Sequence, residues 1–196
     1  MDKPANIVTV GPPDLDRAIA ALTSGFVIDG FNRWIFPEAR DYFRHFPTLV
    51  GAFAGAACED GTVFATEDFG AACVWMRPGL EADGDAVGKL IEEHVRPEIQ
   101  EDLGKAFEGM DAYHHQADPC WYLPVIAVDV PAQGRGLGSA LMKHALRLVD
   151  EDHSAAYLET ATPANVPLYE RFGFEIVGEI KAGSAPTIYP MVRSAR

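Results

Sequence analysis

Hydrophobic and polar residues recur along the chain with two different periods, which predict a succession of strands and helices. Short apolar runs rich in Val, Ile and aromatic residues predict strands at 6–10, 62–67, 71–76, 121–130, 156–160, 174–180 and 187–193. Apolar residues at helical spacing predict helices from Asp14, from Pro37, over 85–107 with an interruption at Pro97, over 137–149, and between Pro163 and Gly173. This order is typical of a single α/β (α+β) domain over residues 1–196, with a mixed sheet and helices on both faces.

The apolar strand at 121–130 ends in a loop with glycines at alternate positions, Gly134, Gly136 and Gly138, and a helix follows at once. The first N–H groups of a helix have no partner inside the helix, and the helix dipole gives that end partial positive charge. Glycine lets a phosphate approach these donors because no Cβ stands in the way. We therefore expect a phosphate-bearing ligand at residues 133–139.

Charge and cysteine content exclude several classes of function. The net charge of −13 argues against a nucleic-acid partner, because such a protein needs a basic face. Three cysteines, Cys58, Cys73 and Cys120, lie far apart and form no CxxC pair, so their spacing indicates neither a disulfide framework nor a zinc site, and no metal is expected. The start Met1–Pro4 lacks the apolar segment of a signal peptide, and no apolar run reaches the length of a membrane span. These features predict a cytoplasmic protein without a membrane partner.

Two common nucleotide-binding motifs fit the glycine loop poorly. A dinucleotide fold needs G-x-G-x-x-G, whereas this chain has G-x-G-x-G followed by Ser139. Glu159 does end the next strand, where a ribose-binding acid could lie, but fewer than 60 residues follow the loop, too few for the second half of that fold. A P-loop needs Lys-Ser or Lys-Thr after the last glycine, which this loop lacks. A nucleotide-binding dehydrogenase is therefore the weakest hypothesis.

Two spaced motifs resemble the GNAT superfamily of acyl-CoA N-acyltransferases. The family's central signature, a strand followed by (Q/R)-x-x-G-x-(G/A), reads Gln133-Gly134-Arg135-Gly136-Leu137-Gly138 here. The C-terminal signature appears as 157–160, then Asn165, then 168–174. Among members of the superfamily, the chain is most similar to puromycin N-acetyltransferase-like proteins. The resemblance implies a GNAT-like domain, with a mostly antiparallel sheet of about six to seven strands, and acetyl-CoA as the co-substrate.

In the family the CoA pyrophosphate lies on the amides of the glycine loop, and the pantetheine arm pairs with the preceding strand. The family also implies that a backbone N–H near Val128 faces the thioester carbonyl, where it would stabilise an oxyanion. The expected cofactor-binding residues are Ile126, Ala127, Val128, Gln133, Gly134, Arg135, Gly136, Leu137, Gly138, Ser139, Asn165 and Tyr169. Asn165 has an alternative role as an N-cap of the helix that follows it.

Tyr169 and Glu159 are the expected catalytic residues. The departing CoA thiolate needs a proton, and the reference pKa of a thiol, about 8.5, lies below that of tyrosine, about 10. Tyr169 is therefore a reasonable proton donor if its hydroxyl is held near the sulfur. Glu159 matches the position of the proposed base in ribosomal-protein alanine acetyltransferases, although it could instead be a structural carboxylate. His114 and His115, expected in an exposed loop, are weaker candidates for the base.

Arg33, Trp34 and Phe36 lie between the first two predicted helices, in the segment that usually forms the acceptor wall in this family. An aromatic wall suits a flat or apolar amine, although these residues could equally belong to the core. The resemblance thus implies an N-acetyltransferase that acts on a small-molecule primary amine by direct transfer in a ternary complex, as a monomer or homodimer. A peptide or amino-acid N-acetyltransferase and a catalytically silent acyl-CoA sensor remain as alternatives.

Overall fold

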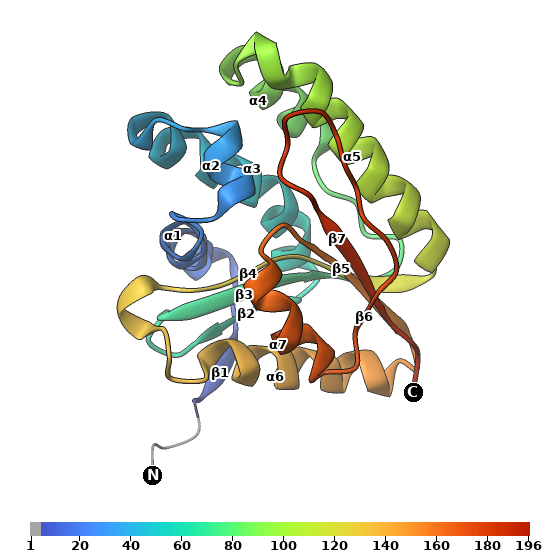
Figure 1. Ribbon diagram of the computed structural model, residues 1–196. Helices are drawn as coiled ribbons and strands as arrows, with labels where there is room; N and C mark the ends of the chain where they lie inside the picture. Colours follow the sequence, from blue (N-terminus) through green and yellow to red (C-terminus); the bar gives the residue numbers. More distant parts are fainter. Residues whose placement is uncertain (1–4) are drawn as a thin grey trace.

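Residues 5–196 of the computed structural model form one seven-stranded sheet with helices packed on both faces (Figure 1). The strands are β1 (Ile7–Thr9), β2 (Val63–Thr66), β3 (Ala71–Met76), β4 (Cys120–Val128), β5 (Ala155–Thr160), β6 (Glu175–Ile176) and β7 (Tyr189–Arg193). Their order is β1-β2-β3-β4-β5-β7-β6, and within this part of the chain β4 and β5 are the one parallel pair. The prediction of a mixed, mostly antiparallel sheet is confirmed.

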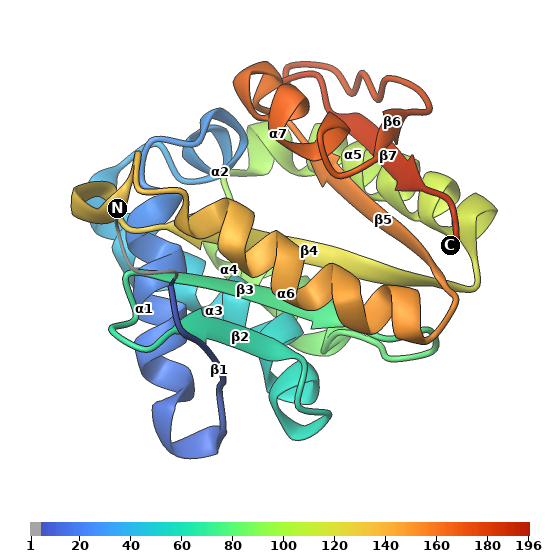
Figure 2. The ribbon, with the colours of Figure 1, turned by 90° about the horizontal axis from the view of Figure 1, so that it is seen from below.

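Helices cover both faces of the sheet, as predicted (Figures 1 and 2). One face carries α1 (Leu15–Gly25), α2 (Gly30–Ile35), α3 (Ala39–Glu59), α4 (Gly84–His94) and α5 (Pro97–Ala117). The other face carries α6 (Leu137–Glu151) and α7 (Val166–Glu170). None of these helices, all within residues 5–196, combines the length and the hydrophobicity needed to cross a membrane. Residues 1–4, the expected signal-free start, lie outside the described residues.

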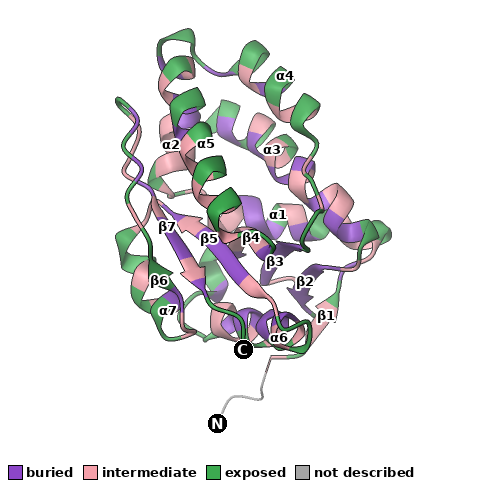
Figure 3. Ribbon diagram, turned by 90° about the vertical axis from the view of Figure 1, so that its right-hand side faces the viewer, coloured by how far each residue is buried: buried purple, intermediate pink, exposed green. Residues whose placement is uncertain are grey.

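Each face of the sheet has its own hydrophobic core, because successive strand residues point to opposite sides. Val74 of β3 packs with Leu22 of α1 and Phe46 of α3, whereas its neighbour Trp75 packs with Leu141 of α6. Figure 3 shows the buried strands enclosed between the two helical layers, with α4 exposed at the periphery. The central strands are therefore buried on both sides, and they provide a rigid base for the site.

Two helical segments differ from the prediction. Residues 30–35, expected as irregular chain, form α2 because the Asp29 carboxylate accepts from the backbone N–H of Asn32 at 3.0 Å and caps the helix. α5 extends ten residues beyond the expected end at 107, to Ala117.

The predicted strand at 174–180 is much shorter in the structure. β6 contains only Glu175 and Ile176, and the chain beyond it pairs again at one isolated bridge, Ile180 to Ile188. Ile176 and Val177 are 44% and 47% exposed. The apolar pattern of this segment therefore does not reflect a buried sheet face, which explains why it misled the prediction.

The central parallel pair separates partway along its length. β4 and β5 pair from Cys120 with Ala155 to Leu123 with Leu158, whereas β4 continues along β3 to Val128. A register shift between Val74 and Met76 of β3 lies opposite Leu123 and Pro124. Pro124 cannot donate a backbone hydrogen bond, and a bulge of this kind bends the strand. The second half of β4 thus has one edge that β5 leaves unpaired.

Candidate active site

The glycine loop leads into α6 through two residues in the left-handed backbone region. Gly134 and Gly136 both have a φ of 75°, a conformation that favours glycine. Within residues 5–196, no side chain caps the first turn of α6, so the N–H groups of 137–139 have neither a helical nor a capping partner. The loop residues from Gln133 to Gly136 are exposed. The loop therefore has the free donors and the open approach that the sequence analysis required of an anion site.

The unpaired edge of β4 offers further backbone donors. The N–H of Asp129 donates to the Gly70 carbonyl at 2.9 Å, which makes Val128 and Ala71 a pair without mutual hydrogen bonds. The N–H of Val128, and by alternation that of Ile126, therefore points away from β3 toward the gap left by β5. This is the edge on which the sequence analysis placed a free N–H near Val128. The Val128 carbonyl accepts the side-chain amide of Gln133 at 3.2 Å, which holds Gln133 against the strand end.

A cavity of about 690 Å³ opens beside this edge, between the two helical layers. Ile126 lines it from β4, Glu159 from the end of β5, and Asn165 and Tyr169 from the turn and helix that follow. The opposite wall is mostly aromatic and is formed by Phe26, Phe31, Phe46, Phe53 and Phe107. Four of the residues expected from the two sequence motifs thus meet on one cavity wall, although they are up to 43 positions apart in the chain.

Glu159 is held inside the cavity wall by two tyrosines. Burial raises the pKa of Glu159 to about 7, and hydrogen bonds from Tyr157 and Tyr122 oppose this rise by stabilising the carboxylate. Burial likewise raises the pKa of each tyrosine above its ordinary value, so both hydroxyls stay protonated as donors. A carboxyl group with a pKa near neutrality is able to accept a proton from a bound ammonium and release it again.

Tyr169 lies almost fully buried, at 6% exposure, on the face of the sheet that α6 covers. Its ring packs edge-on against Phe174 at a centroid distance of 6.3 Å. Burial, with a smaller contribution from Asp29, raises its pKa above the ordinary value of 10.0, so its hydroxyl remains protonated. Asn165 precedes α7 at the N-cap position, but its side chain makes no capping hydrogen bond within the described residues. Its amide is therefore available to the cavity.

The family of the chain follows from a direct comparison. The model of the acetyltransferase (GNAT) family matches residues 37–174, which is more than half of the chain. The chain belongs to the GNAT acetyltransferase family. The resemblance seen in the two sequence motifs is thereby confirmed.

Known proteins similar to this GNAT chain include one from Schizosaccharomyces pombe, described as an uncharacterized N-acetyltransferase. It is 25% identical over 132 residues, covering 58% of this chain and 51% of the relative. This chain therefore spans about half the length of that relative.

Solved structures with the same fold cover almost the whole GNAT chain. One is described as histone acetyltransferase HPA2 and related acetyltransferase, from Corynebacterium glutamicum, with a TM-score of 0.68, 21% identity and coverage of 99% of this chain and 98% of that one. Another is a polyamine N-acetyltransferase of Drosophila melanogaster, with a TM-score of 0.64, 14% identity and coverage of 96% and 100%. At these identities the similarity establishes the fold alone.

The GNAT fold places the three expected acceptor-wall residues beside the cavity rather than on its wall. Phe36 is 1% exposed and belongs to the core under α1 and α3. The Arg33 guanidinium hydrogen-bonds the Pro37 carbonyl, and Trp34 packs against the same core. Because residues 30–35 form a helix, the side of this segment that lines the cavity consists instead of Asp29, Phe31 and Asn32. The residues of this segment that line the cavity are therefore not the three named from the sequence.

The two histidines lie on α5 and not in the exposed loop that the sequence analysis expected. His114 is partly buried, with its ring 5.1 Å from that of Tyr157 and 4.7 Å from that of Tyr122. Burial lowers the pKa of His114, whereas a hydrogen bond to Asp118 raises that of exposed His115.

Tyr122 and Tyr157 were missed as site residues. The sequence feature that could have identified Tyr157 is its position two residues before Glu159, because residues two apart in a strand place their side chains on the same face of β5.

Proposed function

We propose that this protein is an acetyl-CoA-dependent N-acetyltransferase that acts on a primary amine of a small molecule. The observation that carries this proposal is the meeting of Glu159 and Tyr169 on one cavity wall, beside the unpaired edge of β4. A proton acceptor, a proton donor and free backbone N–H groups are the parts that direct acyl transfer to an amine requires. Family membership supports the same reaction.

Each part has one task in the proposed mechanism. Glu159 takes a proton from the bound ammonium, so that the amine nitrogen has a free electron pair to attack the thioester carbonyl. The N–H near Val128 stabilises the negative charge that develops on the carbonyl oxygen. The C–N bond forms as the C–S bond breaks, and Tyr169 protonates the departing thiolate. The attacking nitrogen then releases its second proton to solvent, from which Tyr169 regains its own. The N–H groups of 137–139 and the glycine loop hold the pyrophosphate away from the reacting atoms.

The cavity lining favours a cationic acceptor with an apolar body. Its wall carries carboxylates at Asp29, Glu81, Asp111, Asp118 and Glu159 among mainly aromatic and aliphatic side chains. The net charge of −13 also favours a positively charged substrate over an acidic one. The solved Drosophila melanogaster relative is described as catalysing the formation of N-acetylagmatine. A small amine with an aliphatic or aromatic body is therefore the acceptor class that we propose.

The decisive experiment is a panel of primary amines incubated with acetyl-CoA, in which release of free CoA thiol is recorded. Small mono- and diamines and arylalkylamines should release thiol at rates well above the rate of acetyl-CoA hydrolysis. Faster release with short peptides would support the alternative, a peptide or amino-acid N-acetyltransferase. Calorimetric binding of CoA without thiol release for any amine would instead identify a silent acyl-CoA sensor, and binding of NAD but not CoA would exclude the proposal altogether.

A further inference from the structure

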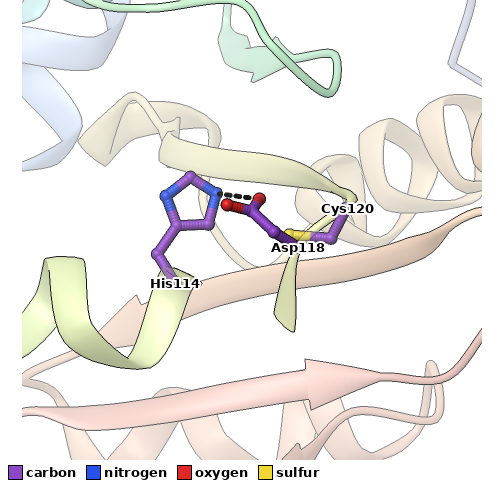
Figure 4. A group of neighbouring side chains, drawn as sticks. All are labelled: His114, Asp118 and Cys120. Atoms are coloured by element: carbon purple, nitrogen blue, oxygen red, sulfur yellow. Dashed lines mark ion pairs between the residues drawn. The ribbon is translucent and has the colours of Figure 1, made fainter. Parts of the chain in front are cut away.

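A second cluster of reactive side chains lies at the junction of α5 and β4, on the same cavity wall. His114 comes from the last turns of α5, Asp118 follows that helix, and Cys120 begins β4 (Figure 4). One ligand atom from each residue lies within 4.8 Å of the other two. We infer that His114, Asp118 and Cys120 form a binding site for a divalent transition-metal ion, with Zn²⁺ as the best fit.

The combination of donor atoms is what points to a metal. Zn²⁺ binds imidazole nitrogen, carboxylate oxygen and thiolate sulfur, and this cluster offers one of each. A tetrahedral Zn²⁺ places its ligand atoms roughly 3.3–3.6 Å apart, so the cluster has to contract by about 1.5 Å at most. The Asp118 side chain is 45% exposed and free to make that movement. A bound ammonium would use the carboxylate alone, and it would gain nothing from the imidazole or the thiol.

The surrounding residues orient two of the three ligands. His114 is stacked on Tyr157, with an angle of 7° between the rings, which fixes the direction of its nitrogens. Nδ1 of His115 lies 3.2 Å from Asp118, and Nε2 of His115 lies 3.4 Å from Asp111. Supporting contacts of this kind to metal ligands typically change metal affinity 10- to 100-fold. The cluster is therefore pre-organised from outside the ligand set.

Access to the site is from the cavity. All three residues line it, so the fourth coordination position faces the space in which the acceptor would bind. Cys120 itself is only 1% exposed, which protects the sulfur from bulk solvent. Binding releases the Cys120 proton to solvent, because the thiolate is the ligand form. No metal was expected from the sequence, since the cysteines form no paired motif and the three ligands come from α5, from β4 and from the turn between them.

Cobalt provides the direct test, because Co²⁺ bound to a thiolate gives an intense near-ultraviolet charge-transfer band. The full chain, freed of metal with a chelator and kept reduced, is titrated with Co²⁺ and then with Zn²⁺. We expect saturation at one equivalent, a thiolate band, and loss of the band when Zn²⁺ displaces Co²⁺. Absence of the band, or binding only in large excess of Co²⁺, would overturn the inference.

Variants locate the site. Cys120→Ser should abolish the band, and Asp118→Asn, at a half-exposed position that does not endanger folding, should weaken binding at least 10-fold. Cys73→Ala is the matched control, since Cys73 is also buried but lies in the core on the α6 face. A band that survives Cys120→Ser, or that disappears in the folded Cys73→Ala variant, would disprove the assignment. Calorimetry in buffers of different ionisation enthalpy should report about one proton released per ion.

Discussion

Tyr122 of β4 and Tyr157 of β5 lie directly opposite each other in the parallel pair, with ring centroids 5.7 Å apart. The Tyr157 hydroxyl donates to the Met110 carbonyl oxygen at 3.2 Å, and both phenols also stabilise the charged form of the Glu159 carboxylate. Tyr157 and Tyr122 limit the rise of the Glu159 pKa, because they stabilise the charged carboxylate while burial destabilises it. Tyr122 and Tyr157 lie one residue before β4 and β5 separate, and these two tyrosines influence the pKa of Glu159, the proposed base.

Glu159→Gln should lower kcat/KM by on the order of 100-fold, because the variant cannot accept the ammonium proton. In the wild-type protein, kcat/KM should rise with pH through the Glu159 pKa of about 7. That rise should be missing from the pH profile of the variant, measured with the best amine of the panel. If both proteins show the same rise near pH 7, another group is the base.

The same residue should make folding stability depend on pH. The pKa of Glu159 is raised from 4.5 to about 7 in the folded chain, so between these values the folded state binds more protons than the unfolded state. The contribution of Glu159 is therefore fully present below pH 4.5 and is lost as pH rises through 7, by up to about 3 kcal/mol. Urea unfolding at pH 5 and pH 8 should show a smaller loss of stability for Glu159→Gln than for the wild type. If both proteins lose the same unfolding free energy between pH 5 and pH 8, Glu159 is not buried as the structure shows.

Tyr169→Phe should lower kcat by on the order of 100-fold while changing the affinity for acetyl-CoA little, because only the transferable proton is removed. Tyr42→Phe is the matched control. Tyr42 is also buried, but its hydroxyl donates to the Thr23 carbonyl at 2.7 Å in the core, so this change should cost about 1 kcal/mol of stability and leave kcat unaltered. Steady-state kinetics with both substrates varied separates the two effects. Unchanged turnover in Tyr169→Phe would remove this residue as the acid.

Gly136→Ala should weaken CoA binding at least 10-fold. The φ of 75° strains any side chain, and the new Cβ would stand where the phosphate approaches the loop. Gly61→Ala is a control with the same backbone strain, since Gly61 has a φ of 74° and open space around it, in the turn between α3 and β2. Both variants should lose similar stability, about 1 kcal/mol, but only Gly136→Ala should lose CoA affinity in calorimetry. Equal CoA affinity in the two variants would place the pyrophosphate elsewhere.

Local patterns predicted the parts of this molecule that depend on local chemistry. The strand and glycine loop around Gly136, and the two faces of the sheet, follow from periodicity and turn residues that a short window contains. Glu159 and Tyr169 were chosen from their motif alone, and the fold brings both to one cavity. Their roles remain predictions that the variants above test.

Features that depend on distant contacts escaped prediction. Phe36 and Phe31 look equivalent in an aromatic-rich segment, and only the Asp29 cap and the resulting turn of α2 decide which one lines the cavity. His114 was assigned to a loop because the apolar period fades after 107, whereas its ring is stabilised by two tyrosines from β4 and β5. Contacts of this kind can be predicted only when the pairing register of β4 and β5 is known.

Arg193 of β7 should be a strong contributor to stability. It is 2% exposed, its guanidinium lies 2.7 Å from Asp150 of α6, and its Nε donates to the Phe172 carbonyl beyond α7 at 3.0 Å. Arg193→Met removes this pair and leaves the Phe172 carbonyl without its donor, while the Asp150 side chain, 39% exposed, turns to water, so the change should cost about 2 kcal/mol in urea unfolding.

Arg147→Met is the control for that change, because Arg147 forms an exposed pair with Glu151 at 3.7 Å on the same helix. Loss of an exposed pair should change the unfolding free energy by less than about 0.5 kcal/mol. Adding Asp150→Asn to Arg193→Met should recover part of the loss, since the uncompensated carboxylate is then removed. Equal effects of Arg193→Met and Arg147→Met would mean that the Arg193–Asp150 pair contributes no more to stability than an exposed pair. A large loss for Arg193→Met alone would establish that it does.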